Sequence, residues 1–135
     1  MSTAVVYYSF TNHTREYAKT LAAQLDAPLI ELAPPKPLSK LGAYLRGCPA
    51  AIGGKSWKTA AEPDFAAYDK LIFCSPIWAS NVPPYVNYAL GLLPEGKHVE
   101  FRLVSAGGKS NCAERLTATV AARGCVVDGI EDIQG

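Results

Sequence analysis

The stretch AVVYYSFTNHTREYAKTLAAQL, residues 4–25, runs from an apolar strand through a polar loop into a helix. Residues 4–8 are apolar, β-branched or aromatic and are bounded by turn-forming residues, which is typical of a buried strand. The helix that follows has an apolar face made of Tyr17, Ala18, Leu21, Ala22 and Leu25. The first N–H groups of a helix have no partner within it, and the helix dipole adds partial positive charge there. This junction therefore predicts an anion site, with phosphate as the natural ligand.

The length of 135 residues predicts one domain, residues 1–135, with one hydrophobic core. The formal net charge is +1 and no basic stripe is present, so we expect no nucleic-acid partner. The apolar stretches are too short to span a membrane and the N-terminus lacks the features of a signal peptide, so we expect a cytoplasmic protein without membrane contact. The four cysteines are widely spaced and the two histidines lie far apart, so we expect no metal site.

Strands and helices alternate along the chain. Further strands are predicted at residues 29–32, 70–75, 98–105 and 125–133. Between them, helices are predicted to begin at Ser39, at Pro83-Pro84 and at Asn111. This order predicts a parallel sheet with helices on both faces.

The helix that Ser39 caps is predicted to end at Gly47 or before Pro49. Its expected inward face consists of Leu41, Tyr44 and Leu45. Residues 50–67 contain two adjacent glycines, Trp57 and a proline, and we expect a long loop there. Trp57 and Tyr44 either roof a ligand pocket or pack under this loop, and packing is the favoured interpretation.

Three loops that leave the carboxyl ends of predicted strands are unusual, and ligands of open parallel sheets bind at this edge. They are the first loop (residues 9–14), the second loop (residues 75–84) and the third loop (residues 105–112). Trp78 can stack on a planar ring, or it can cover the end of the core. Gly107 and Gly108 allow close approach of a ligand, or they form a plain turn before a helix. The first loop has simple helix capping as its alternative, but the three loops together favour a ligand site.

These loops resemble the flavodoxin-like family, especially its shorter bacterial members. SFTNHT, residues 9–14, resembles the family's phosphate loop, usually written S/T-x-T-G-N-T, and SPIWASNVPP and SAGGKSNCAERL resemble its two flavin-flanking loops. The resemblance covers nearly the whole chain. It implies an α/β three-layer sandwich with a five-stranded parallel sheet in the order 2-1-3-4-5, and it implies bound flavin mononucleotide, FMN.

The resemblance also implies which residues bind the cofactor. The FMN phosphate would be held by Ser9, Thr11, Asn12, His13 and Thr14. The isoalloxazine ring would be bordered by Pro76, Ile77, Trp78, Ala79 and Asn81. Its other side would be closed by Ala106, Gly107, Gly108, Ser110 and Asn111. The redox chemistry belongs to the flavin, so no catalytic side chain is named.

The function implied is that of an FMN-binding redox protein, which transfers electrons to a partner protein or reduces a small organic acceptor. The alternative is a flavodoxin-fold binding or assembly module that has lost its flavin. Typical electron-carrier flavodoxins are acidic, whereas this chain is nearly neutral, which favours a small reductase or a carrier with a different partner surface.

The chain departs from the family pattern at further points. Asn12-His13 replaces Gly-Asn, and asparagine tolerates the left-handed backbone that this turn needs. His13 either adds a phosphate donor or points outward. Ser80 replaces a frequent glycine, and we expect it to resist positive φ and so weaken stabilisation of the half-reduced flavin. Cys112 is a redox-active thiol or, as we favour, a small apolar filler.

The family's final helix is missing after residue 133. We therefore expect an apolar area of the sheet to be bare near the last two strands. Large bare apolar patches are usually covered by a partner, so we predict a homodimer, or another chain, over this face. A truncated piece of a longer protein is the alternative.

Overall fold

The computed structural model describes residues 2–10, 12–36 and 39–134, with all side chains except that of Tyr44. Thr11, which was named above as a phosphate-binding residue, therefore lies outside the described residues. The side chain of Tyr44 is also not described, so its expected packing is not tested. The helices and strands run in the order β1 (Thr3–Tyr7), α1 (His13–Leu25), β2 (Leu29–Glu31), α2 (Lys40–Gly42), η1 (Ala43–Gly47), α3 (Cys48–Ile52), β3 (Lys70–Pro76), α4 (Pro84–Leu90), β4 (His98–Ser105), α5 (Ala113–Ala122) and β5 (Val126–Gln134).

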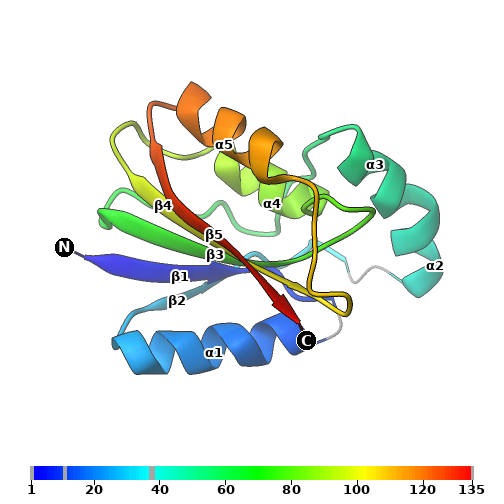
Figure 1. The fold of residues 1–135 in the computed structure, drawn as a ribbon, viewed down its shortest axis with the longest axis horizontal. Helices are drawn as coiled ribbons and strands as arrows, with labels where there is room; N and C mark the ends of the chain where they lie inside the picture. Colours follow the sequence, from blue (N-terminus) through cyan, green and yellow to red (C-terminus); the bar gives the residue numbers. More distant parts are fainter. Residues whose placement is uncertain (1, 11, 37–38, 135) are drawn as a thin grey trace.

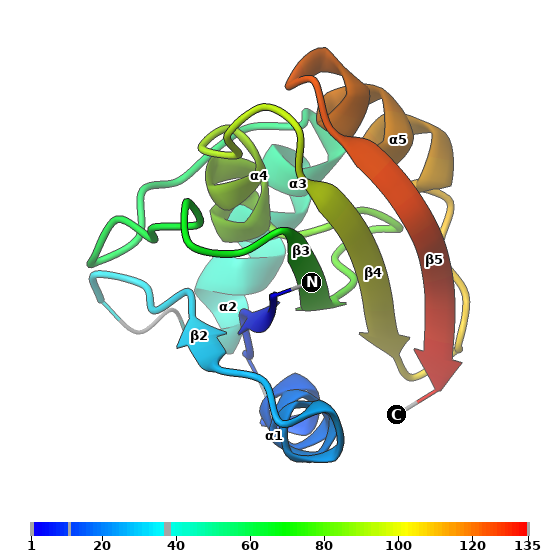
Figure 2. The ribbon, with the colours of Figure 1, turned by 90° about the vertical axis from the view of Figure 1, so that its left-hand side faces the viewer.

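The strands form one sheet in the order β2-β1-β3-β4-β5, and every neighbouring pair is parallel. This is the predicted fold class and strand order. Figures 1 and 2 show α1 on one face of the sheet and α4 and α5 on the other, with α2, η1 and α3 at one end. Within the described residues, no helix has the length and apolarity needed to cross a bilayer.

The alternation of side chains along the strands divides the core between the two faces of the sheet. Residues of β1, β3 and β4 that pack with α4 and α5 include Val6, Phe73 and Phe101. On the other face, Val5, Tyr7 and Cys74 pack with Ala18 and Ala22 of α1. A central strand with helices on both faces must be apolar throughout, which explains the unbroken apolar runs at β1 and β3.

The helical segment α2–η1–α3 differs from its prediction in length and in orientation. It continues past Gly47 and Pro49 to Ile52. Leu41 is 66% exposed and Leu45 is 60% exposed, so their predicted inward position is wrong. The inward positions are instead taken by small residues, Ala43, Gly47, Ala50 and Ala51.

Two physical causes explain this difference. Cys48 donates its N–H to the carbonyl of Ala43, five residues back, so the helix widens at η1. The wide turn gives room for Pro49, whose ring would otherwise clash with the preceding turn. The second cause is Trp78, whose indole lies so close to Gly47 that larger inward residues have no space there.

The sheet face beside α1 also differs from its prediction near the last two strands. No helix follows β5 in the described residues. Along β4, Val99, Phe101 and Leu103 are buried, while the alternate residues Glu100 and Arg102 point to the other face. The face therefore carries charges where apolar surface was expected.

These charges form a polar ladder, defined here as Lys70, Glu100, Arg102 and Glu131 on β3, β4 and β5. Lys70 pairs with one oxygen of Glu100, and Arg102 Nη1 lies 2.8 Å from the other. Arg102 Nε lies 3.4 Å from Glu131 Oε2. The expectation of a bare apolar area is wrong at these positions, because charged residues already occupy them. The homodimer itself stays a prediction.

Candidate functional site

A cavity of about 310 Å³ lies at the carboxyl end of the sheet, where the three loops meet. It is lined by Phe10, His13, Thr14, Pro76, Ile77, Trp78, Val104, Ser105 and Ala106. The loops follow β1, β3 and β4. Since β2 and β3 lie on opposite sides of β1, the strand order reverses here, and this reversal point is where open α/β sheets bind ligands.

The first loop has the features of an anion-binding turn. Asn12 precedes α1 with φ 78°, so it adopts the left-handed conformation expected of it. The Ser9 hydroxyl oxygen accepts hydrogen bonds from the N–H groups of Asn12 (3.0 Å) and Arg15 (3.2 Å). None of the described residues accepts a hydrogen bond from the N–H of His13 or Thr14. These groups at the start of a 13-residue helix suit an anion such as a phosphate.

His13 and Thr14 both line the cavity although their exposure differs. Thr14 is buried and His13 is exposed. His13 was expected either to add a phosphate donor or to point outward. Its side chain lies at the cavity and is also exposed to solvent. An imidazole at this position can donate a hydrogen bond to an anion at the start of α1.

The second loop contains a tight turn with two left-handed residues. Ala79 has φ 50° and Ser80 has φ 69°, which together define a type I′ turn. Trp78 and Asn81 close the turn by exchanging backbone hydrogen bonds of 2.7 and 3.0 Å. Ser80 thus adopts positive φ although its side chain disfavours that conformation. These hydrogen bonds offset a conformational cost of about 1–2 kcal/mol for each non-glycine residue.

The turn also contacts the third loop, because the Asn111 N–H donates to the Ser80 carbonyl at 3.3 Å. The second and third loops thus close one side of the cavity together.

Trp78 combines the two roles that its position allowed. It is only 7% exposed, and its ring contacts Tyr8 and Phe10 edge to face at centroid distances of 5.8 and 5.7 Å. It therefore covers the end of the core. It also lines the cavity, where it supplies an aromatic surface.

The third loop is attached to the end of β5. Ser110 Oγ donates to Asp132 Oδ1 at 2.8 Å, and Gln134 Nε2 donates to the Ala106 carbonyl at 3.3 Å. Gly108 has φ 65°, and a Cβ there would stand 3.1 Å from the Cβ of Gln134. The loop therefore needs glycine at this position both for its backbone and for its contact with β5.

Cys112, which follows this loop, is buried. Burial raises the pKa of its thiol, so a smaller fraction of the thiol is present as the reactive thiolate. These properties support the interpretation of Cys112 as an apolar filler.

The structure brings the predicted loops together but does not place every predicted residue at the cavity. Those that line it are His13, Thr14, Pro76, Ile77, Trp78 and Ala106. Others lie in the same loops without lining it, namely Ser9, Asn12, Ala79, Asn81, Gly107, Gly108, Ser110 and Asn111. Prediction from the sequence missed Phe10, Val104 and Ser105. Phe10 had a signal, since it is the one large apolar residue inside the first loop.

Solved structures provide the comparison for this fold. A protein from Bacteroides eggerthii DSM 20697, provisionally described as a flavoprotein, is similar with a TM-score of 0.81 and 21% identity over 96% of this chain and 86% of that one. A flavoprotein from Lactobacillus acidophilus NCFM in complex with FMN has a TM-score of 0.69 and 19% identity over 96% and 91% of the two chains. The Megasphaera elsdenii flavodoxin has a TM-score of 0.56 and 15% identity over 97% and 87%.

These likenesses show that the chain has the flavodoxin-like fold, as its resemblance implied. No protein-family model and no curated protein sequence matches the chain.

Proposed function

We propose that this chain binds FMN and acts as a redox protein, either by transferring electrons to a partner protein or by reducing a small organic acceptor. One observation carries the proposal. The start of α1, with its anion-binding features, and the aromatic surface of Trp78 lie at the same cavity. A phosphate needs the former and a planar ring needs the latter.

The residues present fit this cofactor. The N–H groups of His13 and Thr14 would hold the phosphate, and the Ser9 hydroxyl would fix the turn that presents them. Trp78 and Ile77 would border the ring on one side and Ala106 on the other. The volume of about 310 Å³ is near the lower end of the range of about 300–1,000 Å³ for small-molecule sites. When bound, the flavin would supply the redox chemistry, and the protein would orient it and restrict access of water.

The similar structures support both forms of the proposal. They include a flavodoxin and an FMN complex, and also an azoreductase from Bacillus anthracis and an NADH:FMN oxidoreductase. The nearly neutral charge of this chain favours reduction of a small acceptor, because carriers that are steered to basic partners are strongly charged.

The test is a titration of the purified protein with FMN, followed by the loss of flavin fluorescence. We expect quenching with the unmodified chain. Trp78→Ala should bind about 5- to 150-fold more weakly, since removal of one stacking aromatic costs about 1–3 kcal/mol. Trp57→Ala is the matched control, because Trp57 does not line this cavity.

Circular dichroism of both variants would exclude unfolding as the cause, and Trp78→Phe provides a milder change at the same position. No quenching at tens of micromolar protein would overturn the proposal and would favour the flavin-free binding module. If FMN binds, turnover of quinone or nitro acceptors would distinguish a reductase from an electron carrier.

A further inference from the structure

A second, larger cleft of about 600 Å³ lies beside η1 and the start of α4. It is lined by Pro35, Lys36, Arg46, Ser56, Trp57, Lys58 and Tyr85. None of these residues lines the cavity at the three loops, so the cleft is a separate site.

Two aromatic rings form a corner in this cleft. The rings of Trp57 and Tyr85 are 5.5 Å apart between centroids and meet at 74°. Tyr85 is only 6% exposed and forms the floor, whereas Trp57 is half-buried. The backbone N–H of Trp57 donates to the Pro84 carbonyl at 3.1 Å, and this hydrogen bond fixes the loop on α4. A planar ligand can stack on one ring and meet the other edge to face.

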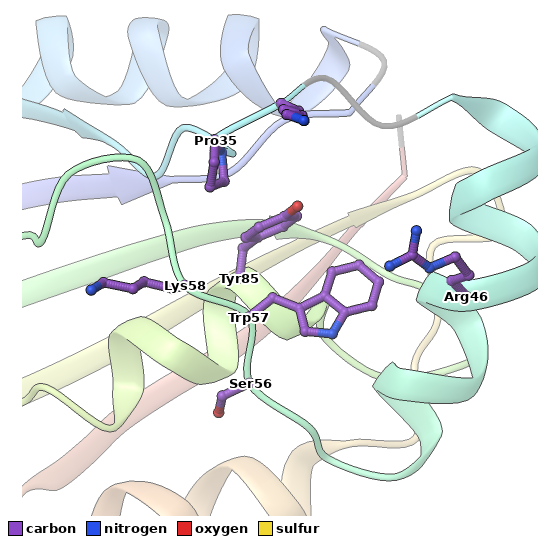
Figure 3. A pocket seen from close by; sticks show the side chains of 7 residues that line it. Pro35, Arg46, Ser56, Trp57, Lys58 and Tyr85 are labelled. Carbon is purple, nitrogen blue, oxygen red and sulfur yellow. The ribbon is translucent and has the colours of Figure 1, made fainter.

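Three cationic side chains line the same cleft as these rings. Arg46, Lys36 and Lys58 line the cleft, and no acidic residue is among the described residues that line it. In the described part of the chain, none of the three forms an ion pair. Figure 3 shows the guanidinium of Arg46 directed toward the two rings, with Lys58 on their opposite side. Three cations at one cleft are a local excess in a chain whose net charge is +1.

We propose that this cleft binds a nucleotide, that is, a planar ring that carries phosphates. The corner of Trp57 and Tyr85 would hold the ring, and Arg46 would bind a phosphate. Guanidinium groups match phosphate geometry with two parallel hydrogen bonds, and the guanidinium of Arg46 is directed toward the rings. None of the described residues hydrogen-bonds to the Tyr85 hydroxyl, so that group can also serve the ligand.

Packed aromatic side chains connect the cleft with the candidate flavin cavity. Tyr85 packs on Tyr8 at a centroid distance of 5.1 Å, and Tyr8 contacts Trp78. Next to Arg46 in η1, Gly47 lies against the six-membered ring of that indole. A nucleotide in the cleft would therefore contact Tyr85 and Arg46, whose neighbours Tyr8 and Gly47 touch Trp78. The nucleotide proposal does not depend on flavin binding.

The experiment uses the intrinsic fluorescence of Trp57. The chain has two tryptophans, so Trp78→Phe leaves Trp57 as the single tryptophan, which is excited at wavelengths that tyrosine does not absorb. This variant is titrated with ADP, with adenosine as a ring without phosphate, and with inorganic pyrophosphate as an anion without a ring. We expect ADP to quench the emission and to bind at least tenfold more tightly than either fragment. Pyrophosphate binding as tight as ADP would overturn the proposal in favour of a simple anion site.

Variants identify the residues involved, with binding measured by calorimetry in the otherwise unmodified chain. Arg46→Gln should weaken ADP about tenfold or more and leave adenosine unchanged, because it removes a charged hydrogen bond. Trp57→Ala should weaken both ligands, and Trp57→Phe should restore part of the loss. Lys19→Gln, an exposed lysine of α1, is the control and should change nothing. Equal ADP affinity in Arg46→Gln and the unmodified chain would contradict the proposal.

A competition experiment distinguishes the two sites. Saturating FMN should leave the ADP titration unchanged, because the two ligands would occupy different cavities. FMN is itself a planar ring with a phosphate, so displacement is judged together with Arg46→Gln. Displacement of ADP by FMN, with an ADP affinity that Arg46→Gln does not change, would place ADP at the loops and overturn this inference. Failure of FMN to bind would reject the flavin proposal alone, since the ADP titration is made without flavin.

Discussion

The indole of Trp78 lies directly against the backbone of Gly47. A Cβ on Gly47 would stand 2.5 Å from Trp78 Cζ3 and 2.8 Å from Cε3, which is closer than real Cβ contacts. The indole therefore determines which residue η1 can have at its point of closest approach. The contact joins the helical segment that carries Arg46 to the wall of the candidate flavin cavity.

Gly47→Ala should lower the free energy of unfolding by about 1–3 kcal/mol, because the added methyl group overpacks the core. Urea unfolding measures this loss. Gly53→Ala is the matched control, since φ there is −76° and the nearest atom to a Cβ would be 3.5 Å away. We expect Gly53→Ala to be neutral or stabilising. A Gly47→Ala variant as stable as Gly53→Ala would refute the contact.

Ser80→Gly should raise the free energy of unfolding by about 0.5–1 kcal/mol, because glycine adopts φ 69° without strain. Ser56→Gly is the control: Ser56 is an exposed loop residue that is not among those with positive φ. There, glycine should be neutral or destabilising. Equal effects of the two changes in thermal unfolding would show that the turn at Ser80 is not strained.

The cysteines should differ in their reaction with a thiol reagent. Burial raises the pKa of Cys74 to about 12, and nearby Arg102 opposes this only in part. Cys112 and Cys125 are also buried, whereas Cys48 is half-buried. We expect one fast thiol in the native protein and all four in concentrated guanidinium. Loss of the fast phase in Cys48→Ser would assign it, and several fast native thiols would contradict the burial of the other three.

The polar ladder should make stability depend on pH in the acid range. Burial raises the pKa of Glu100, but hydrogen bonds from Lys70 and Arg102 lower it further, and the net pKa is below its ordinary value of 4.5. The folded state therefore binds this proton less tightly than the unfolded state. The resulting stability is present above about pH 4.5 and is lost as the pH falls through the folded pKa.

Glu100→Gln should lower the free energy of unfolding at pH 7 by about 1.5–3 kcal/mol, the range for hydrogen bonds to charged groups. Urea unfolding at neutral and acid pH should show this difference shrink below pH 4.5. Glu62→Gln, at an exposed loop residue, is the control and should have the same stability as the unmodified chain. A Glu100→Gln loss that stays constant with pH would argue against the ladder.

The homodimer remains a prediction, but its interface would differ from the apolar one that was expected from the sequence. The sheet face next to α1 presents the polar ladder at β4 and β5, so a dimer through this face would be held partly by charges. Light scattering at micromolar concentration should then show a dimer that weakens as salt increases. A clean monomer at low salt would reject it.

The alternation of strands and helices was enough to predict a parallel sheet and the three loops, because these follow from local patterns and from the handedness of crossovers. The order of the strands came from the family resemblance. The orientation of the helix after Ser39 could not be predicted, because helical spacing favoured its leucines while the deciding contact was with Trp78, far along the chain. The polar ladder was missed for a related reason. Glu100 and Arg102 alternate with buried residues, whereas the prediction expected apolar surface near the last two strands.

Within the site, the sequence predicted the loops better than the individual residues. Trp78, His13 and Thr14 line the cavity as their loops suggested. Ser110 does not, because its hydroxyl is bound to Asp132, 22 residues further along the chain. A local motif carries no information about such a distant hydrogen bond.

The attachment of the third loop to β5 has a practical consequence for handling the protein. Ser110 and Ala106 are hydrogen-bonded to Asp132 and Gln134, so the outer strand fixes the loop. A fusion partner or affinity tag joined directly after Gln134 would start beside the ligand-binding edge, and we expect it to disturb the hydrogen bonds between β5 and the third loop. β1 begins at the opposite end of the sheet, as Figure 1 shows. Tags for ligand-binding measurements therefore belong at the amino terminus.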